Sequence, residues 1–69
     1  MITLGIDIGS TTSKCVLLFD GYQILGTSLV PAGIGTSGPE EAYKAVLKHS
    51  SLSERAIART IATGYGRRL

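Results

Sequence analysis

The chain has 69 residues, of which 43% are hydrophobic and 17% charged, and its formal net charge is +2. A chain of this length forms one small domain or a piece of a larger one. The small charge, without aromatic residues interleaved among the arginines near the end, argues against a nucleic-acid partner. No apolar run approaches the roughly 20 residues of a membrane span and no signal peptide is recognisable, so we expect a cytoplasmic protein without a membrane partner.

The first half of the chain predicts three strands. Residues 2–9 alternate apolar residues with polar residues or glycine, which is the period of two that a strand shows. Residues 14–19 are apolar nearly throughout, which is typical of a strand covered on both faces. Asp20-Gly21 is a strong hairpin signal, so residues 22–30 are predicted to return as a third, antiparallel strand.

A glycine-rich loop and a helix follow. The loop occupies residues 31–38, and Pro39 is predicted as the first helical residue. Glu40 and Glu41 suit the positive end of the helix dipole. Within residues 42–47, the apolar side chains fall on one helical face.

The remaining elements complete an α/β fold. Ser51 and Glu54 have the spacing of a capping box, which predicts a short helical turn over residues 53–58. Residues 60–63 predict a fourth strand, and the helix can carry the chain across to lay this strand parallel to the first. The prediction is a mixed sheet in the order 3-2-1-4, with the helix between strands 3 and 4 lying on one face.

The turn between the first two strands is the strongest candidate site. It is built from glycine and small hydroxyl residues: Gly9, Ser10, Thr11 and Thr12. Backbone N–H groups in such a turn can point at an anion without side-chain obstruction, and the hydroxyls add donors. Asp7 can hold a divalent cation directly or through its waters, and Lys14 adds positive charge. On spacing alone, a phosphate site and a structural hairpin turn capped by Asp7 stand about level.

A second glycine-rich segment, residues 33–38, matches the dinucleotide pattern GxGxxG literally. The strand before it is the return strand of a hairpin rather than the opening strand of a βαβ unit, and Pro31 and Ala32 separate the two. The next strand ends in Thr63-Gly64, without an acidic residue to bind a ribose. We therefore interpret this segment as a flexible loop that leads into the helix, and not as an NAD site.

Residues 5–14, GIDIGSTTSK, resemble the first phosphate motif of the sugar kinase, heat-shock chaperone and actin ATPase superfamily. Together with GIGTSGP at residues 33–39 and ATGYGR at residues 62–67, they resemble the activators of 2-hydroxyacyl-CoA dehydratases, which belong with the ATPase subunits of benzoyl-CoA reductases. The resemblance implies a ribonuclease-H-like lobe, a homodimer, Mg-ATP bound between two lobes, and one [4Fe–4S] cluster at the subunit interface. It also implies that ATP hydrolysis drives an electron into a partner dehydratase.

Carried over residue by residue, the resemblance assigns Asp7 to catalysis, where it would help hold Mg²⁺ through water. Lys14 would neutralise phosphate charge. The residues that would bind the β- and γ-phosphates are Gly9, Ser10, Thr11 and Thr12. Because the second phosphate motif, the adenosine-binding glycines and the cluster cysteines are missing, residues 1–69 would be the N-terminal part of an actin-like ATPase lobe, inactive alone.

Four single residues outside this motif carry expectations of their own. Cys15 is expected to be a buried structural cysteine, because it lies in an apolar strand and one thiolate per chain cannot hold a cubane cluster. His49 is expected to interact with the negative end of the helix or with solvent. For Tyr65 and Arg67, a role in the ligand cleft and a solvated loop both stay open.

Two other functions remain open from the sequence. One is the N-terminal part of a small-molecule kinase of the same superfamily, which would use the same first motif to transfer a phosphoryl group to a hydroxyl. The other is a small, non-enzymatic α/β interaction module, in which Asp7 and the hydroxyl turn would be structural.

Overall fold

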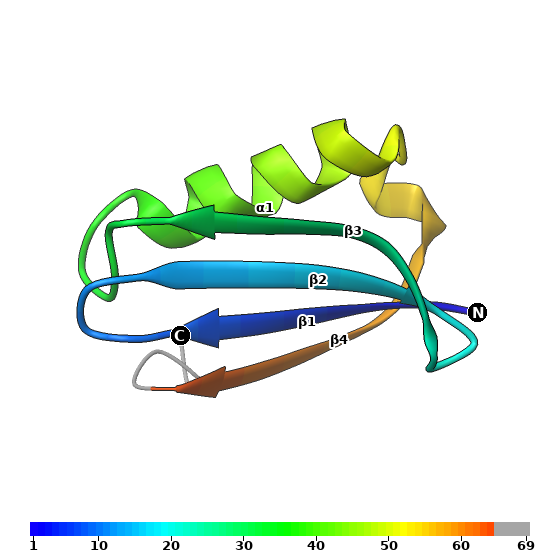
Figure 1. The fold of residues 1–69 in the computed structure, drawn as a ribbon, viewed down its shortest axis with the longest axis horizontal. Helices are drawn as coiled ribbons and strands as arrows, with labels where there is room; N and C mark the ends of the chain where they lie inside the picture. Colours follow the sequence, from blue (N-terminus) through cyan, green and yellow to red (C-terminus); the bar gives the residue numbers. More distant parts are fainter. Residues whose placement is uncertain (65–69) are drawn as a thin grey trace.

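The computed structural model describes residues 1–64. Its elements, in chain order, are β1 (Ile2–Ile8), β2 (Ser13–Phe19), β3 (Gln23–Val30), α1 (Gly38–Ser50), the 3₁₀ turn η1 (Glu54–Ala56) and β4 (Ile57–Gly64). The sheet has the order β3-β2-β1-β4, in which β1 is antiparallel to β2 and parallel to β4 (Figure 1). The predicted order and the position of the helix between the third and fourth strands are therefore confirmed.

The hairpin between β2 and β3 forms where the sequence predicts it. Asp20 and Gly21 both adopt the left-handed backbone conformation, with φ of 52° and 82°. This pair suits the twist of the flanking strands. The N–H of Tyr22 donates to the carbonyl of Phe19 at 3.3 Å, and the strand resumes one residue later than predicted.

Helix α1 covers one face of the sheet and packs against β2 and β3 (Figure 1). The core between the two layers consists of Leu4, Cys15, Leu17, Ala42 and Val46, all at most 3% exposed. Alternate strand residues enter this core, because successive side chains on a strand point to opposite faces. No helix within residues 1–64 has both the length and the apolar character needed to cross a bilayer.

Cys15 lies in this core, as expected for a structural cysteine. Burial raises the pKa of its thiol, and a hydrogen bond with Ser28 acts in the opposite direction. The hydroxyl of Ser28 also donates to the carbonyl of Ala42 at 2.6 Å and ties β3 to α1. The side of β2 that carries Cys15 is thus committed to the helix interface.

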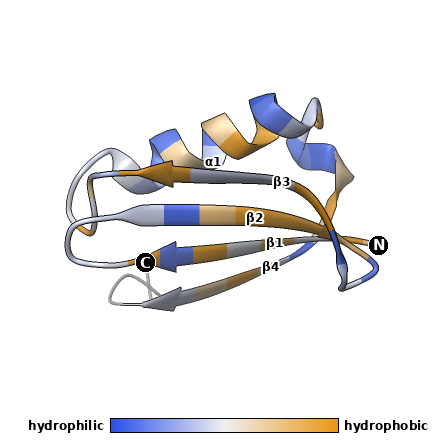
Figure 2. Cartoon of the chain, in the orientation of Figure 1, coloured by the Kyte–Doolittle hydropathy of each residue, from blue (hydrophilic) through white to orange (hydrophobic). Residues whose placement is uncertain are grey.

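The other face of the sheet differs from the expectation for β2. Val16 and Leu18 point away from α1 and are only half-buried, and Lys14 is exposed. Among the described residues no second layer covers this face, so β2 is buried on one side rather than on both. The face forms a groove of about 810 Å³. Figure 2 shows hydrophilic segments of β1 and β2 at one end of the sheet and mainly hydrophobic strand beyond them.

The ends of the helical segments differ from the predicted capping box. Ser51 is the C-cap of α1, with a φ of 59°, and its N–H donates to the last carbonyls of the helix. Ser53 precedes η1 without a side-chain cap, and the Glu54 carboxylate accepts a hydrogen bond from Tyr43 at 3.0 Å. The capping-box prediction is wrong, because Ser51 terminates one helix instead of starting the next.

His49 also makes a contact that the sequence did not predict. Its Nδ1 lies 3.0 Å from the carbonyl oxygen of Thr27 on β3. The imidazole therefore links the last turn of α1 to the neighbouring strand, at the rim of the groove.

Candidate phosphate-binding site

The predicted phosphate turn, the loop over residues 33–38, the N-terminus of α1 and the end of β4 all lie at one end of the sheet (Figure 1). This arrangement follows from the topology, because β1 and its parallel neighbour β4 both end here. In open α/β sheets, ligands bind outside the carboxyl ends of the parallel strands. Three glycine-containing segments, the turn at Gly9, the loop over residues 33–38 and the end of β4 at Gly64, thus lie at the edge where a ligand is expected.

The turn from Gly9 to Thr12 leaves most of its hydrogen-bonding groups unused. The N–H of Gly9 donates to the carbonyl of Thr12 at 2.9 Å and closes the hairpin. Within residues 1–64, the N–H groups and hydroxyls of Ser10, Thr11 and Thr12 donate no hydrogen bond. Ser10 and Thr11 are exposed and Thr12 is half-buried. Adjacent free N–H groups of this kind form an anion-binding concavity.

Gly9 has no role in the fold that another residue could not fill. Its φ is not positive, and an added Cβ would lie 3.5 Å from the carbonyl oxygen of Thr12, which is ordinary van der Waals contact. The missing side chain leaves open the space beside the carbonyl and hydroxyl oxygens of Thr12.

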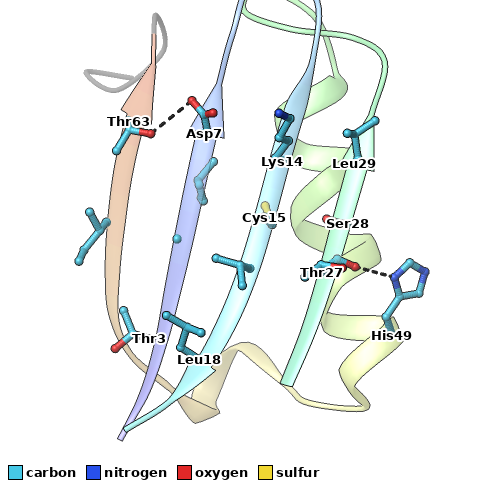
Figure 3. A pocket seen from close by; sticks show the side chains of 14 residues that line it. Thr3, Asp7, Lys14, Cys15, Leu18, Thr27, Ser28, Leu29, His49 and Thr63 are labelled. Carbon is cyan, nitrogen blue, oxygen red and sulfur yellow. Dashed lines mark hydrogen bonds between the residues drawn. The ribbon is translucent and has the colours of Figure 1, made fainter. Parts of the chain in front are cut away.

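Asp7 and Lys14 flank this turn on adjacent strands. They are cross-strand partners in the register of β1 and β2, and both side chains enter the groove on the face opposite α1 (Figure 3). Both are exposed, and they make no ion pair with each other. The Asp7 carboxylate instead accepts a hydrogen bond from the Thr63 hydroxyl at 3.3 Å. The carboxylate and the ammonium group therefore both remain available to a ligand.

The structure places the six predicted site residues at one end of the sheet but not in one cavity. Asp7 and Lys14 line the groove, whereas the turn residues do not. The residues outside the groove are Gly9, Ser10, Thr11 and Thr12. The candidate site is therefore the rim where the turn meets the end of the groove. It offers N–H and hydroxyl donors on one side and a carboxylate and an ammonium group on the other.

The second glycine-rich loop packs directly beneath this turn. The N–H of Ile34 donates to the carbonyl of Gly9 at 2.9 Å. A Cβ on Gly33 would lie only 2.2 Å from the same carbonyl oxygen. The loop leads into α1, as predicted, and it also packs against the turn from Gly9 to Thr12. Only the glycine at position 33 is required for this contact, because it is the added Cβ of Gly33 that would clash.

Both hydroxyls of that loop and half of its N–H groups, those of Ile34, Thr36 and Gly38, donate hydrogen bonds within residues 1–64. The Thr36 hydroxyl donates to the carbonyl of Gly33 at 2.6 Å and accepts from the N–H of Gly38 at 2.9 Å. A Cβ on Gly38 would lie 2.0 Å from the carbonyl oxygen of Ala32. These contacts tie the loop to its own backbone and to the segment before it.

The donor set at the rim fits a magnesium ion bound together with phosphates. Within residues 1–64, no group of three or more His, Cys, Asp and Glu side chains gathers around one point. Mg²⁺ keeps several waters and needs only one or two carboxylates when substrate phosphates complete its shell. Asp7 can supply such a carboxylate.

The same residues do not fit an iron–sulfur cluster. The whole chain contains one cysteine, Cys15, and its thiol is buried in the helix interface. A [4Fe–4S] cluster in the full-length protein would have to take its thiolates from outside this chain. Tyr65 and Arg67, for which a cleft role stayed open, lie outside the described residues.

The sheet order and the helix on one face are those of the actin-like, ribonuclease-H-like fold. The chain belongs to the BadF/BadG/BcrA/BcrD ATPase family, whose model matches residues 4–69.

Similar proteins share this segment closely. The (R)-2-hydroxyglutaryl-CoA dehydratase activating ATPase of Acidaminococcus fermentans is 52% identical over 65 residues, which are 94% of this chain and 25% of the relative. The activator of lactoyl-CoA dehydratase from Anaerotignum propionicum is 48% identical over 67 residues, which are 97% of this chain and 26% of the relative. The chain therefore spans about a quarter of the length of these relatives.

A solved structure has the same fold. The activator of the 2-hydroxyisocaproyl-CoA dehydratase from Clostridium difficile, with bound ADPNP, superposes with a TM-score of 0.93 at 39% sequence identity. The match covers 97% of this chain and 25% of the activator. That protein binds a nucleotide whose polyphosphate is the kind of anion that an open hydroxyl turn can receive.

Proposed function

We propose that this chain is the phosphate-binding portion of an ATPase that activates a 2-hydroxyacyl-CoA dehydratase. One observation carries the proposal: the turn from Gly9 to Thr12 offers unused donors beside a carboxylate and an ammonium group that do not pair with each other. Family membership supports it, as do relatives that are activators of such dehydratases.

The proposed division of labour follows from the chemistry of each group. The N–H groups and hydroxyls of Ser10, Thr11 and Thr12 would bind the β- and γ-phosphate oxygens, with Gly9 leaving room for their approach. Lys14 would neutralise charge on the phosphates. Asp7 would hold the water shell of Mg²⁺. Phosphoryl chemistry of this type depends on positioning and electrostatic stabilisation and needs no covalent nucleophile from the protein.

The family and its relatives extend the proposal to the full-length protein. We expect a cytoplasmic homodimer that binds Mg-ATP between two lobes and couples hydrolysis to electron transfer into a dehydratase. This chain would supply only the first phosphate-binding motif of the full-length protein. The isolated chain is therefore expected neither to bind ATP tightly nor to hydrolyse it.

A neutralising substitution in the full-length protein tests the proposal. Asp7→Asn removes the charge that holds Mg²⁺, so the rate of phosphate release from ATP should fall on the order of 10²-fold or more. The fold should persist, because Asp7 is exposed and outside the core. Asp20→Asn is the matched control, because Asp20 lies in the distant β2–β3 hairpin with a left-handed φ that asparagine tolerates.

Activity assays on the same full-length proteins distinguish an activator of a dehydratase from a small-molecule kinase. With ATP and a reductant, the wild-type protein should activate an inactive 2-hydroxyacyl-CoA dehydratase, and it should hydrolyse ATP without an alcohol acceptor. An unchanged ATPase rate in Asp7→Asn would contradict the site assignment. Phosphorylation of a small alcohol, without activation of the dehydratase, would contradict the activator function.

A further inference from the structure

The Asp7 carboxylate lies between two cross-strand neighbours on the same face of the sheet. Lys14 on β2 is its partner on one side and Thr63 on β4 its partner on the other. It makes no ion pair with Lys14, whereas its Oδ1 accepts a hydrogen bond from the Thr63 hydroxyl at 3.3 Å (Figure 3). The carboxylate is thus held by β4, and the lysine stays free.

The next residue of β4 also fits closely against Asp7. Gly64 has a φ of 83°, a backbone conformation that side-chain-bearing residues rarely adopt. A Cβ at this position would lie 2.6 Å from Asp7 Oδ1 and 2.5 Å from the carbonyl oxygen of Ile8. Any other residue at this position would therefore push the carboxylate out of its place.

We propose that Thr63 is a positioning residue for the cation-binding carboxylate and that Gly64 leaves the room this requires. The terminal torsion of an aspartate is broad and roughly two-fold, so the side chain alone does not fix which oxygen faces a ligand. The hydrogen bond to Oδ1 selects one orientation and leaves Oδ2 without a partner within residues 1–64. The free oxygen can then meet the water shell of Mg²⁺. The inference rests on the proposed function of Asp7.

Groups that orient a metal-binding side chain affect affinity for the metal without touching it. Loss of such a partner typically costs 10- to 100-fold in metal affinity or activity. Thr63 should belong at the low end of this range, because its hydrogen bond is exposed. It is not a catalytic residue, since it contacts neither the cation nor a phosphate in this arrangement.

The test uses the full-length protein with Mn²⁺ as the metal probe and ADPNP as the nucleotide. Free Mn²⁺ is counted by electron paramagnetic resonance, which needs no turnover. Thr63→Val removes the hydroxyl at constant shape and should weaken Mn²⁺ binding about tenfold. Thr63→Ser keeps the hydroxyl and should restore the affinity. Thr3→Val, on the same strand and face as Asp7, should change nothing.

Two further measurements separate positioning from a loss of structure. The Mg²⁺ concentration for half-maximal ATPase should rise in Thr63→Val, while the rate at saturating Mg²⁺ and the melting temperature without nucleotide stay near wild type. Gly64→Ala should weaken Mn²⁺ binding more than Thr63→Val and should also lower the melting temperature, because its Cβ meets the Ile8 backbone as well as the carboxylate.

Wild-type Mn²⁺ affinity in Thr63→Val, or a loss that serine does not restore, would overturn the inference. Asp7→Asn distinguishes this failure from that of the proposed function. If Asp7→Asn weakens Mn²⁺ binding and Thr63→Val does not, only the positioning role is wrong. If Asp7→Asn also binds Mn²⁺ like the wild type, the cation site itself is wrong.

Discussion

Two glycine-containing segments of this chain look alike in sequence and behave differently in the structure. Within residues 1–64, only the Gly9 N–H of the turn from Gly9 to Thr12 donates a hydrogen bond. The loop over residues 33–38, by contrast, donates from both hydroxyls and from three of its N–H groups. A side chain at Gly9 would fit into the fold, because its Cβ would make only ordinary contacts. A side chain at Gly33 would not fit, because its Cβ would clash with the backbone of the turn. A glycine that the fold does not need is thus the better sign of a ligand.

The largest effect should come from a substitution in the loop over residues 33–38. In Gly33→Ala, the new Cβ meets the carbonyl oxygen of Gly9 at 2.2 Å and the backbone of Ser10 at 2.5 Å. Neither atom belongs to a flexible side chain, so the substitution should cost about 3 kcal/mol of stability. A lowered melting temperature of the full-length protein, together with weaker ADPNP binding by the displaced turn, measures this. A melting temperature equal to wild type would show that the loop does not support the turn.

The matching substitution in the turn should separate stability from binding. In Gly9→Ala, the new Cβ makes only ordinary contacts, so the melting temperature should stay close to wild type. The methyl group would lie against the Thr12 hydroxyl, which is one of the proposed phosphate donors, so affinity for ADPNP should fall on the order of tenfold, or about 1.4 kcal/mol. Calorimetric titration of the full-length protein measures the affinity. A variant as unstable as Gly33→Ala would remove the distinction between the two segments.

Much of the fold followed from local patterns. The alternation over residues 2–9 and the Asp20-Gly21 hairpin correctly predicted three strands. The amphipathic helix correctly predicted the crossover that places β4 parallel to β1. The capping box failed because Ser51 adopts a left-handed conformation at the end of α1, which nearest-neighbour spacing does not reveal. The prediction that both faces of β2 are buried is also not confirmed within residues 1–64. A continuous apolar run does not show which element of the fold covers each face.

The contribution of Lys14 should be smaller, because its side chain is exposed and its charge is screened. Lys14→Gln should weaken ADPNP binding by less than tenfold and reduce the dependence of that affinity on salt. Lys44→Gln is the matched control, since Lys44 is an exposed lysine of α1 that pairs with Glu40 at 3.0 Å. Equal losses in the two variants would mean that general surface charge, and not the position of Lys14, attracts the nucleotide.

The sequence predicts the part of the candidate site that is formed by residues close together in the chain. Asp7, the hydroxyl turn and Lys14 fall within eight consecutive residues, so a single hairpin brings them together. The contacts of Thr63 with Asp7 and of Gly33 with Gly9 join positions far apart in the chain. Such contacts depend on the register of β4 against β1 and on the path of the loop, which no spacing rule supplies.

The smallest effect should follow from Ser37→Ala, in the loop that matches the dinucleotide pattern. The Ser37 hydroxyl donates to the exposed Glu41 carboxylate at 2.6 Å and does not cap the helix. Its loss should change stability by less than about 0.5 kcal/mol and leave ADPNP affinity unaltered. The wild-type protein should likewise show no saturable binding of NAD, because the loop follows β3, the return strand of a hairpin, rather than the first strand of a βαβ unit. Saturable NAD binding that Gly35→Val abolishes would reverse the comparison, since Gly35 has open space around it and a φ of 80°. The loop, rather than the turn, would then be a nucleotide site in its own right.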